Sequence, residues 1–272
     1  MRISGKTKVV GLLGYPVEHS LSPAMHNAAF RHLGLDYCYV SFPVAPGFLR
    51  RAIDGVRALD ISGANVTVPH KEDVIAFLDE VSEEASFIGA VNTILNSRGI
   101  LKGHNTDGRG FMQSLYEAGI TVRGKSVLIV GAGGACRAIS YYISAEAEVL
   151  KIYDIDHLRR DRLVRDLSSI RSNVVHLGSL NSLEGTDVII NATPLGLKDN
   201  DPSPIDTDLL TSSMSACDLI YKETAFLKSA SEKGCKTLNG LGMLLHQGVL
   251  AFEIWTGVKP PIDIMRKALA GE

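Results

Sequence analysis

The stretch Ser126-Val127-Leu128-Ile129-Val130-Gly131-Ala132-Gly133-Gly134-Ala135 decides the fold. It runs from an apolar, strand-like segment directly into glycines, and a helical pattern follows from about Ala135 to Ala145. Glycines at the first and third loop positions let the backbone turn tightly and approach a pyrophosphate, whose charge is met by free N–H groups at the start of the helix. The stretch therefore predicts a strand–loop–helix unit that binds a dinucleotide. Because Cys136 stands where the G-x-G-x-x-G pattern has its third glycine, a glycine turn that binds nothing is the alternative.

A second strand-like run, Val149 to Asp154, ends in a carboxylate 23 positions after Gly131. A carboxylate at this place bonds the hydroxyls of a ribose and repels an added 2′-phosphate, by about 1 kcal/mol per charge pair in water and about 4 kcal/mol near a protein surface. Asp154 therefore favours NAD. Arg159 and Arg160 on the following helix argue the other way, since a guanidinium there reaches a phosphate, although a charge run on a helix is more typical of a solvated face.

Strand-like runs alternate with helical patterns along the whole chain, which predicts an α/β fold with largely parallel sheets. The expected strands are Lys8 to Tyr15, Tyr37 to Val44, Ile61 to Val68, Lys125 to Val130, Val149 to Asp154, Asp187 to Asn191 and Cys217 to Tyr221. Helices are expected over Pro23 to Leu33, with Ser22 as the N-cap, and over Asp107 to Ala118, ending at Gly119.

A chain of 272 residues is long enough for two domains, each with its own core. Since Lys125 opens a fresh strand–loop–helix unit after Gly119 and Gly124, we expect a Rossmann-like, doubly wound dinucleotide-binding domain over residues 105–238. Residues 1–104 plus 239–272 then form an α/β substrate-binding and catalytic domain. The C-terminal segments Leu241 to Trp255 and Pro261 to Ala270 are apolar at helical spacing and are expected to return to this N-terminal domain.

Composition limits the partners of the protein. The net charge of −2 offers no electrostatic case for nucleic acid or an anionic membrane, so a small-molecule substrate is expected, with the protein a monomer or a homodimer. Four cysteines without a C-x-x-C pair indicate reduced thiols and argue against a zinc site, so no metal is expected. The polar start of the chain and the lack of an eighteen-residue apolar run indicate a cytoplasmic protein.

Two charged residues supply chemistry that a redox cofactor lacks. Asn65-Val66-Thr67-Val68-Pro69-His70-Lys71 turns at a proline and presents a lysine, and Gly103-His104-Asn105-Thr106-Asp107 ends in a carboxylate. Lys71 is the candidate proton donor to a carbonyl oxygen as the carbon receives hydride, and Asp107 is the charge that holds this donor in place. A surface lysine and a first-turn acid, favourable by about 0.3–1 kcal/mol at a helix N-terminus, are the structural alternatives.

Ser20 and Ser22 lie at a strand exit beside the expected helix N-terminus, where hydroxyls and spare backbone donors suit a carboxylate. For Ser22 the alternative is an ordinary N-cap.

Seven segments together resemble the shikimate dehydrogenase family, in order and over essentially the whole chain. They are Ser20-Leu21-Ser22-Pro23-x-Met25-His26-Asn27, Asn65-Val66-Thr67-Val68-Pro69-His70-Lys71, Gly89-Ala90-Val91-Asn92-Thr93, Gly103-His104-Asn105-Thr106-Asp107, Gly131-Ala132-Gly133-Gly134-Ala135, Asn191-Ala192-Thr193-Pro194-Leu195-Gly196 and Gly240-Leu241-Gly242-Met243-Leu244-x-x-Gln247. The resemblance implies NADPH-dependent, reversible reduction of 3-dehydroshikimate to shikimate, a step in the biosynthesis of chorismate and the aromatic amino acids.

The resemblance also implies roles for individual residues. Ser20 and Ser22 would hold the substrate carboxylate, with Tyr221 nearby, and Lys71 would protonate the reacting oxygen with its ammonium fixed by Asp107. The residues implied to contact the ring hydroxyls and the reacting oxygen are Thr67, Lys71, Asn92, Asp107 and Gln247. The residues implied to bind the cofactor are Gly131, Ala132, Gly133, Gly134, Ala135, Asp154, Arg159, Thr193, Leu219 and Gly240, of which Leu219 and Gly240 would line the nicotinamide.

Two departures from the family pattern keep alternatives open. Members that use NADP commonly carry Asn-Arg-Ser/Thr where this chain has Asp154-Ile155-Asp156, so the family indicates NADP and the local residues indicate NAD. Lys222-Glu223 stand where the family often has Asn-Pro. A quinate/shikimate dehydrogenase that uses NAD is the nearest alternative function. A non-catalytic nucleotide or metabolite sensor is an alternative of another class, and it has no need of the proton donor Lys71.

Overall fold

The computed structural model describes residues 3–271 and divides into two compact units. Unit 1 comprises residues 1–106 and 245–272, and unit 2 comprises residues 107–244. The sequence places the junctions at 104/105 and 238/239, and the assignment of substrate to one unit and cofactor to the other stays a prediction. None of the helices within residues 3–271 has the length and apolar character needed to cross a membrane.

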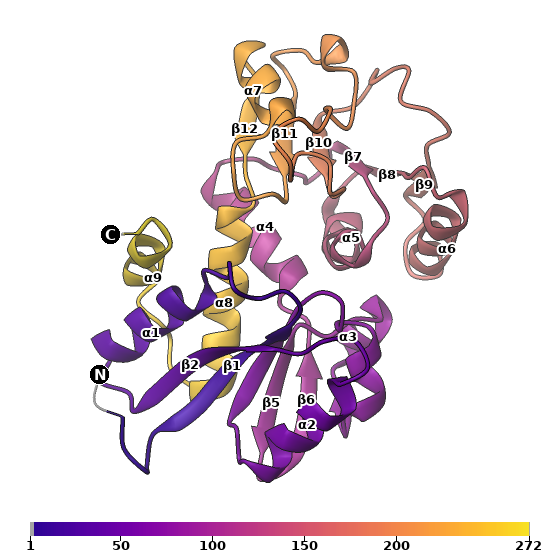
Figure 1. The fold of residues 1–272 in the computed structure, drawn as a ribbon. Helices are drawn as coiled ribbons and strands as arrows, with labels where there is room; N and C mark the ends of the chain where they lie inside the picture. Colours follow the sequence, from indigo (N-terminus) through magenta and orange to yellow (C-terminus); the bar gives the residue numbers. More distant parts are fainter. Residues whose placement is uncertain (1–2, 272) are drawn as a thin grey trace. The chain divides into compact units, whose positions relative to one another are not determined.

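Unit 1 is built on a mixed six-stranded sheet (Figure 1). In spatial order its strands are β2 (Tyr37–Pro43), β1 (Lys8–Gly14), β3 (Gly63–Val66), β5 (Thr93–Ser97), β6 (Ile100–His104) and β4 (Glu80–Val81). β1 is parallel to β2 and β3, whereas β5 is antiparallel to both β3 and β6. Sequence analysis did not find the β5–β6 hairpin because Asn96 and Ser97 interrupt its apolar pattern just before the turn at Arg98 and Gly99, both with positive φ.

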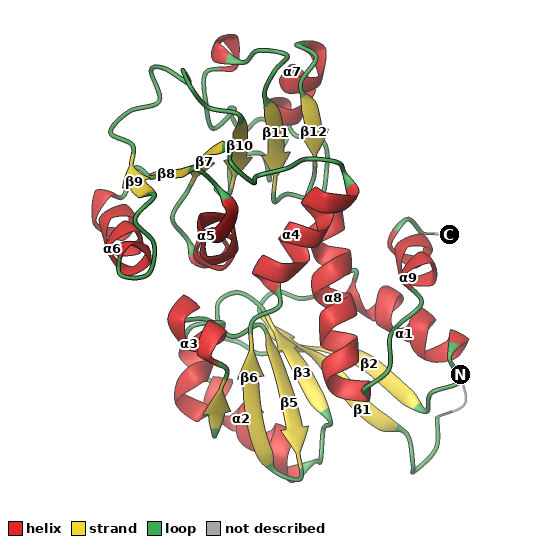
Figure 2. Ribbon diagram, turned by 180° about the vertical axis from the view of Figure 1, so that it is seen from behind, coloured by secondary structure: helices red, strands yellow, loops and turns green. Residues whose placement is uncertain are grey.

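Helices cover both faces of this sheet. They are α1 (Ser22–His32), α2 (Leu49–Ala58), the 3₁₀ helix η1 (Asp73–Phe77), α3 (Glu83–Ile88), the second part of α8 (Leu241–Thr256) and α9 (Ile262–Leu269). One core joins β1 and β2 to α1, α8 and α9 through side chains such as Phe30, Tyr39 and Phe252. A second core, with Ile53 and Val66, lies between the other face and α2. Figure 2 shows the two groups of helices on opposite sides of the sheet, and the C-terminal helices belong to unit 1 as expected.

The expected N-cap of α1 is wrong. Leu21 occupies the N-cap position, Ser22 is already the first helical residue, and no side chain caps this end. Ser22 is only 6% exposed, and its side chain lies beside the hydroxyl of Tyr39 of β2. The serine that local sequence rules assign to the helix end is therefore held inside the unit.

Unit 2 is built on an all-parallel six-stranded sheet. In spatial order its strands are β12 (Lys236–Leu238), β11 (Ser215–Asp218), β10 (Val188–Asn191), β7 (Ser126–Val130), β8 (Val149–Tyr153) and β9 (Val174–His176). Counted within the unit, this is the Rossmann order 3-2-1-4-5-6, and the chain reverses its direction of winding between β7 and β10. The prediction of a doubly wound dinucleotide-binding fold is confirmed.

The side chains of successive residues of β7 point to opposite faces of this sheet, as strand geometry requires. Leu128 and Val130 pack into a core with Phe226 of α7 (Ala225–Glu232), on the side of the 3₁₀ helix η2 (Thr207–Leu209). α5 (Gly134–Glu146) and α6 (His157–Ser168) follow β7 and β8 as crossover helices, and α4 (Asp107–Glu117) packs on α5. A side chain at Gly108 would overlap the backbone of Ala138, so this glycine permits the close contact of α4 with α5.

The last expected strand, Cys217 to Tyr221, is displaced. The strand begins earlier, at Ser215, and ends at Asp218. The buried carboxylate of Asp218 accepts a hydrogen bond from the backbone N–H of Ile220 at 3.0 Å, which turns the chain out of the sheet.

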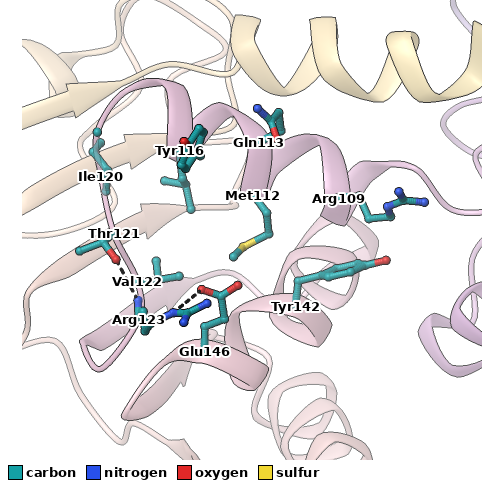
Figure 3. Close-up of a pocket in the computed structure, with 12 residues that line it drawn as sticks. Arg109, Met112, Gln113, Tyr116, Ile120, Thr121, Val122, Arg123, Tyr142 and Glu146 are labelled. Carbon is teal, nitrogen blue, oxygen red and sulfur yellow. Dashed lines mark hydrogen bonds and ion pairs between the residues drawn. The ribbon is translucent and has the colours of Figure 1, made fainter. Parts of the chain in front are cut away.

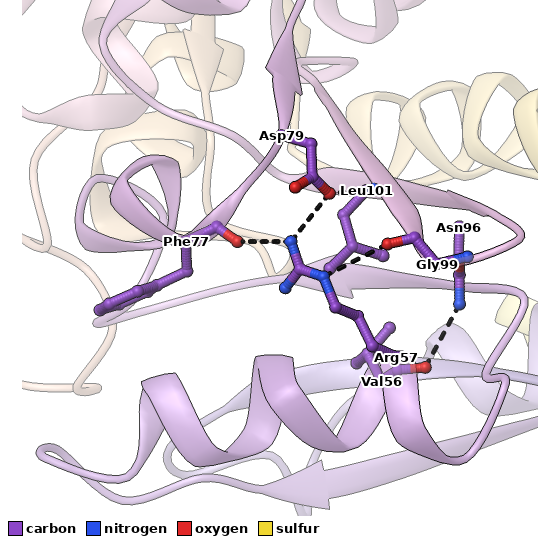
Figure 4. Close-up of polar contacts among 7 residues, drawn as sticks. All are labelled: Val56, Arg57, Phe77, Asp79, Asn96, Gly99 and Leu101. Carbon is purple, nitrogen blue, oxygen red and sulfur yellow. Dashed lines mark hydrogen bonds and ion pairs between the residues drawn. The ribbon is translucent and has the colours of Figure 1, made fainter.

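One arginine ties three segments of unit 1 together (Figure 4). From α2, Arg57 donates to the carbonyls of Phe77 at 3.1 Å and Gly99 at 3.3 Å, and to the carboxylate of Asp79 at 2.8 Å. Asp79 also accepts from the N–H of Leu101 at 2.7 Å. This N–H and the guanidinium hold the pKa of Asp79 below its usual range. Arg57 thus joins α2 to the end of η1 and to the β5–β6 hairpin.

We expect Arg57→Met to lower the free energy of unfolding by about 1–3 kcal/mol, because it removes the donor from two carbonyls and a carboxylate while it retains an apolar stem. Urea denaturation of the full chain measures the change. Arg50→Met is the matched control, since Arg50 is exposed on the same helix. Equal midpoints for the two variants would contradict the role of Arg57.

Candidate functional site

A chain of buried polar side chains crosses the sheet of unit 1. The amide of Asn65 donates to the carbonyl of Asn92 and to the hydroxyl of Thr93, both at 3.1 Å. Asn92 in turn accepts from the backbone N–H of Thr106 at 2.8 Å and donates to its hydroxyl at 2.9 Å. All four residues are at most 5% exposed. The predicted substrate residue Asn92 is therefore held in a single orientation by its neighbours.

Tyr39 extends this network to Ser22. Its hydroxyl donates to Oδ1 of Asn65 at 2.9 Å, and the side chain of Ser22 lies beside it. Burial raises the pKa of Tyr39 far above its ordinary value, so the phenol stays neutral. Sequence analysis missed both Tyr39 and Asn65. The sequence signal that could have found these two residues was a polar side-chain atom within an otherwise apolar strand.

The topology of the sheet brings the predicted substrate residues to one edge. Ser20 and Ser22 follow the carboxyl end of β1, and Thr67 and Lys71 follow that of its parallel neighbour β3. Asn92 precedes β5, which is antiparallel to β3, so it joins the same edge. The contacts agree with this placement. They are Ser22 N to Ser20 Oγ at 3.3 Å, Thr67 N to the carbonyl of Leu13 at 2.9 Å, Val91 N to the carbonyl of Lys71 at 2.8 Å and Val66 N to the carbonyl of Asn92 at 2.9 Å.

Close packing around this edge depends on two glycines. A side chain on Gly14 would overlap the methyl group of Thr67. A side chain on Gly248 would overlap Met25, so α8 lies close to α1. Gln247, the remaining predicted substrate residue of unit 1, is the immediate neighbour of Gly248 and is 9% exposed.

His26 belongs to the core and not to a metal site. Its ring is fully buried and stacks on Tyr39 with ring centroids 4.6 Å apart. Burial lowers the pKa of His26 to about 3, so the ring is neutral. Across residues 3–271, no three His, Cys, Asp or Glu side chains gather closely enough to hold a metal ion.

The glycine loop of unit 2 lies at the point where the strand order reverses. Gly131 has φ +104°, and a Cβ on it would stand 2.8 Å from the carbonyl of Ala192 in the loop after β10. Gly133 is the N-cap of α5, with no side chain over the free N–H groups of the helix. Glycine is thus required where the two loops meet, and the open helix end suits a pyrophosphate. Gly134 and Ala135 form the first turn of α5, and Thr193 follows Ala192 directly.

Asp154 is attached to the glycine loop. Its carboxylate accepts from the N–H of Ala132 at 2.6 Å and from the N–H of Asp156 at 2.8 Å. Asp156 caps α6 by accepting from the N–H of Arg159 at 3.0 Å, and the Arg159 side chain is 61% exposed beside it. Arg160 points elsewhere, because it is 6% exposed and bonds Asp161 and the carbonyl of Leu177. Only Arg159 of the two arginines stays a candidate for phosphate.

The remaining predicted residues of unit 2 lie on the loops after β11 and β12 and at the start of α4. A side chain on Gly240 would overlap the carbonyl of Leu219, so these two predicted nicotinamide neighbours are packed together. Desolvation and, secondarily, the carboxylate of Asp107 raise the pKa of Tyr221 to about 12, although about half of the tyrosine surface is open. Asp107 itself is 6% exposed. Its pairing with Lys71 of unit 1 stays a prediction.

Unit 2 also has a surface pocket of about 710 Å³, which is separate from the predicted site residues (Figure 3). Met112 and Tyr116 of α4 and Tyr142 of α5 line it, and Arg123 pairs with Glu146 across it at 3.6 Å. None of the predicted site residues lines this pocket.

The Rossmann strand order, the glycine loop at the switch point and a carboxylate at the end of the second strand define a dinucleotide-binding protein of the dehydrogenase class. The chain belongs to the shikimate dehydrogenase family. Residues 12–94 match the model of the shikimate dehydrogenase substrate binding domain, and residues 240–270 match that of the shikimate 5'-dehydrogenase C-terminal domain.

Known proteins resemble the chain over nearly its full length. The shikimate dehydrogenase (NADP(+)) of Carboxydothermus hydrogenoformans is 47% identical over 99% of both chains. A crystal structure of a shikimate dehydrogenase in complex with NADP+ superposes with a TM-score of 0.94 at 42% identity, covering 99% of this chain and 97% of the other. Shikimate 5-dehydrogenase from Listeria monocytogenes, in complex with shikimate and NAD, has a TM-score of 0.91 at 37% identity and 98% coverage of both chains. The family resemblance is confirmed.

Proposed function

We propose that this chain is a shikimate dehydrogenase, which reversibly reduces 3-dehydroshikimate to shikimate in the biosynthesis of aromatic amino acids. The observation that carries the proposal is the gathering of Ser20, Ser22, Thr67, Lys71 and Asn92 at one edge of the unit 1 sheet. Relatives of high similarity carry this activity in their names. All four cysteines are free thiols, which supports a cytoplasmic location as part of the proposal.

The substrate is a ring with one carboxylate and several hydroxyls, and the residues match this chemistry. Ser20 and Ser22 donate to the carboxylate, with the hydroxyl of Tyr221 as a further donor. Thr67, Asn92 and Gln247 pair the ring hydroxyls. Each polar group left without a partner in a closed site costs about 1–3 kcal/mol, so this set rejects analogues that lack a hydroxyl.

Lys71 transfers the proton. A bound nicotinamide cofactor supplies the hydride. The ammonium of Lys71 donates to the carbonyl oxygen and neutralises the alkoxide that forms there, and in the reverse direction the amine accepts the proton of the hydroxyl. Asp107 keeps the ammonium charged and oriented. Lys71 is half-buried and Asp107 is buried. Burial strengthens their electrostatic interactions with the substrate relative to bulk water.

The names of the relatives carry NADP(+), whereas the residues around Asp154 in this chain support NAD within the NAD(P) class. Two carboxylates, Asp154 and Asp156, stand at the carboxyl end of β8, and the first is fixed to the glycine loop. Ile155 between them is 85% exposed and carries no charge for a 2′-phosphate. Arg159 is the residue that would attract a 2′-phosphate, and its side chain already lies beside the carboxylate of Asp156. A 2′-phosphate therefore meets more negative than positive charge here.

Turnover with shikimate and with quinate, each with NAD and with NADP, tests the proposal in one plate. We expect shikimate with NAD to give the highest kcat/KM. Faster turnover of quinate would favour the quinate/shikimate dehydrogenase alternative. Binding of cofactor without turnover of either acid would indicate the sensor instead.

Lys71→Ala is expected to lower kcat by roughly 10²–10⁴-fold, because it removes the group that gives and takes the proton. Steady-state kinetics with shikimate measure the change. Lys102→Ala, which removes a surface lysine paired with Glu80, is the matched control and should keep wild-type rates. A loss below about threefold in Lys71→Ala would exclude it as the proton donor.

Asp154→Asn is expected to shift the kcat/KM ratio toward NADP by about fivefold or more, since it removes a charge pair worth about 1–4 kcal/mol against the 2′-phosphate. With its oxygen toward Ala132, the Asn keeps the bond to the glycine loop, and its NH2 group replaces the oxygen that accepts from the N–H of Asp156. Asp161→Asn removes the same charge from α6, where the carboxylate pairs with Arg160, and serves as control. An unchanged ratio would show that Asp154 does not face the ribose.

A further inference from the structure

We propose that Asp218 is a positioning residue for the nicotinamide side of the site, through which the loops after β10 and β11 are held in one arrangement. This inference rests on the proposed function and deepens it. Asp218 ends β11 and is fully buried. It was not among the residues that the sequence or the family resemblance assigned to the site.

Three donors converge on the carboxylate of Asp218. Oδ1 accepts from the N–H of Ile220 at 3.0 Å, and Oδ2 accepts from the amide of Asn191 at 3.1 Å and the hydroxyl of Thr224 at 2.8 Å. Burial raises the pKa of Asp218, and the three hydrogen bonds act in the opposite direction. Oriented dipoles therefore support the charge of the carboxylate.

Asn191 links Asp218 to the loop after β10. Its Oδ1 accepts from the N–H of Thr193 at 3.0 Å and from the Thr193 hydroxyl at 2.7 Å, while Nδ2 also donates to the carbonyl of Leu195 at 3.0 Å. Asn191 is fully buried. The same loop presents the carbonyl of Ala192 that lies against the glycine loop at Gly131.

Thr224 and Ile220 link Asp218 to the loop after β11. Thr224 caps α7 and packs against Gly196, where a Cβ would stand 2.8 Å from its methyl group. The carbonyl of Ile220 accepts from the N–H of Gly240 at 2.9 Å. Leu219 and Tyr221, which flank Ile220, are therefore fixed on either side by the turn that Asp218 makes.

Only a carboxylate satisfies this geometry. An amide at position 218 presents its NH2 group either to the N–H of Ile220 or to the donors of Asn191 and Thr224, so one donor faces another in both orientations. Asp218→Asn keeps the volume and removes the match. This substitution should displace the loops that carry Thr193, Leu219 and Tyr221 and leave the Asp154 side of the unit unchanged.

The experiment compares turnover with the binding of ADP, a probe for the half of the cofactor held by the glycine loop and Asp154. In the full chain, Asp218→Asn should lower kcat with shikimate by about tenfold or more, since small misplacements of reacting groups cost up to about a hundredfold. The Kd for ADP should stay within about twofold of wild type. A merely structural role would weaken ADP binding and turnover together.

Three further variants test whether the effect comes from the hydrogen bonds of Asp218. Thr224→Val removes one donor and should lower kcat, and Thr224→Ser should restore it. Asp206→Asn is the matched control, because this exposed carboxylate caps η2 in the same unit. A kcat for Asp218→Asn within about twofold of an active wild type, or a parallel loss of ADP binding, overturns this inference alone. A wild type without turnover of shikimate overturns the proposed function and this inference with it.

Discussion

The approach of the glycine loop to the loop after β10 is the constraint on which unit 2 depends. The carbonyl of Ala192 occupies the space where any side chain on Gly131 would lie. Ligands of open α/β sheets bind in the crevice at such a switch point. The bond from Ala132 to Asp154 then joins a third loop to the pair. The missing methyl group at Gly131 thus permits the close approach of these loops at the predicted dinucleotide site.

Unit 1 solves a different physical problem, because polar side chains must stay oriented inside a sheet. Tyr39, Asn65, Asn92 and Thr106 hydrogen-bond one another, so the network orients each of these side chains. A fully connected network of this kind rigidifies its members, whereas a half-satisfied one destabilises the core. The predicted substrate residues at the edge of the sheet stand on this ordered scaffold. Such preorganisation lowers the entropy lost when a flexible polar ligand is bound.

Much of the fold was readable from the sequence because its signals are local. The strand–loop–helix unit at Gly131 and the carboxylate of Asp154 lie within a short span and follow known geometry. The wrong predictions concern positions where tertiary structure decides. Ser22 is a buried helical residue beside Tyr39 and not an N-cap, and β11 ends early because Asp218 accepts from the N–H of Ile220. Tyr39 and Asp218 gained their importance from partners on other strands, Asn65 and Asn191, and no spacing rule connects such pairs.

The division of the chain bears on the order in which its parts become stable during synthesis. Unit 2 is one uninterrupted segment, whereas the core of unit 1 contains Phe252, Trp255 and Met265, which leave the ribosome more than a hundred residues after Thr106. Domains fold as units as they emerge. Unit 2 can therefore reach its native state while unit 1 still exposes the aromatic surface of Phe30 and Tyr37. During that interval the nascent chain exposes apolar surface that is prone to aggregate. Truncation of α9 removes Met265 from the core of unit 1, the unit that is synthesised first.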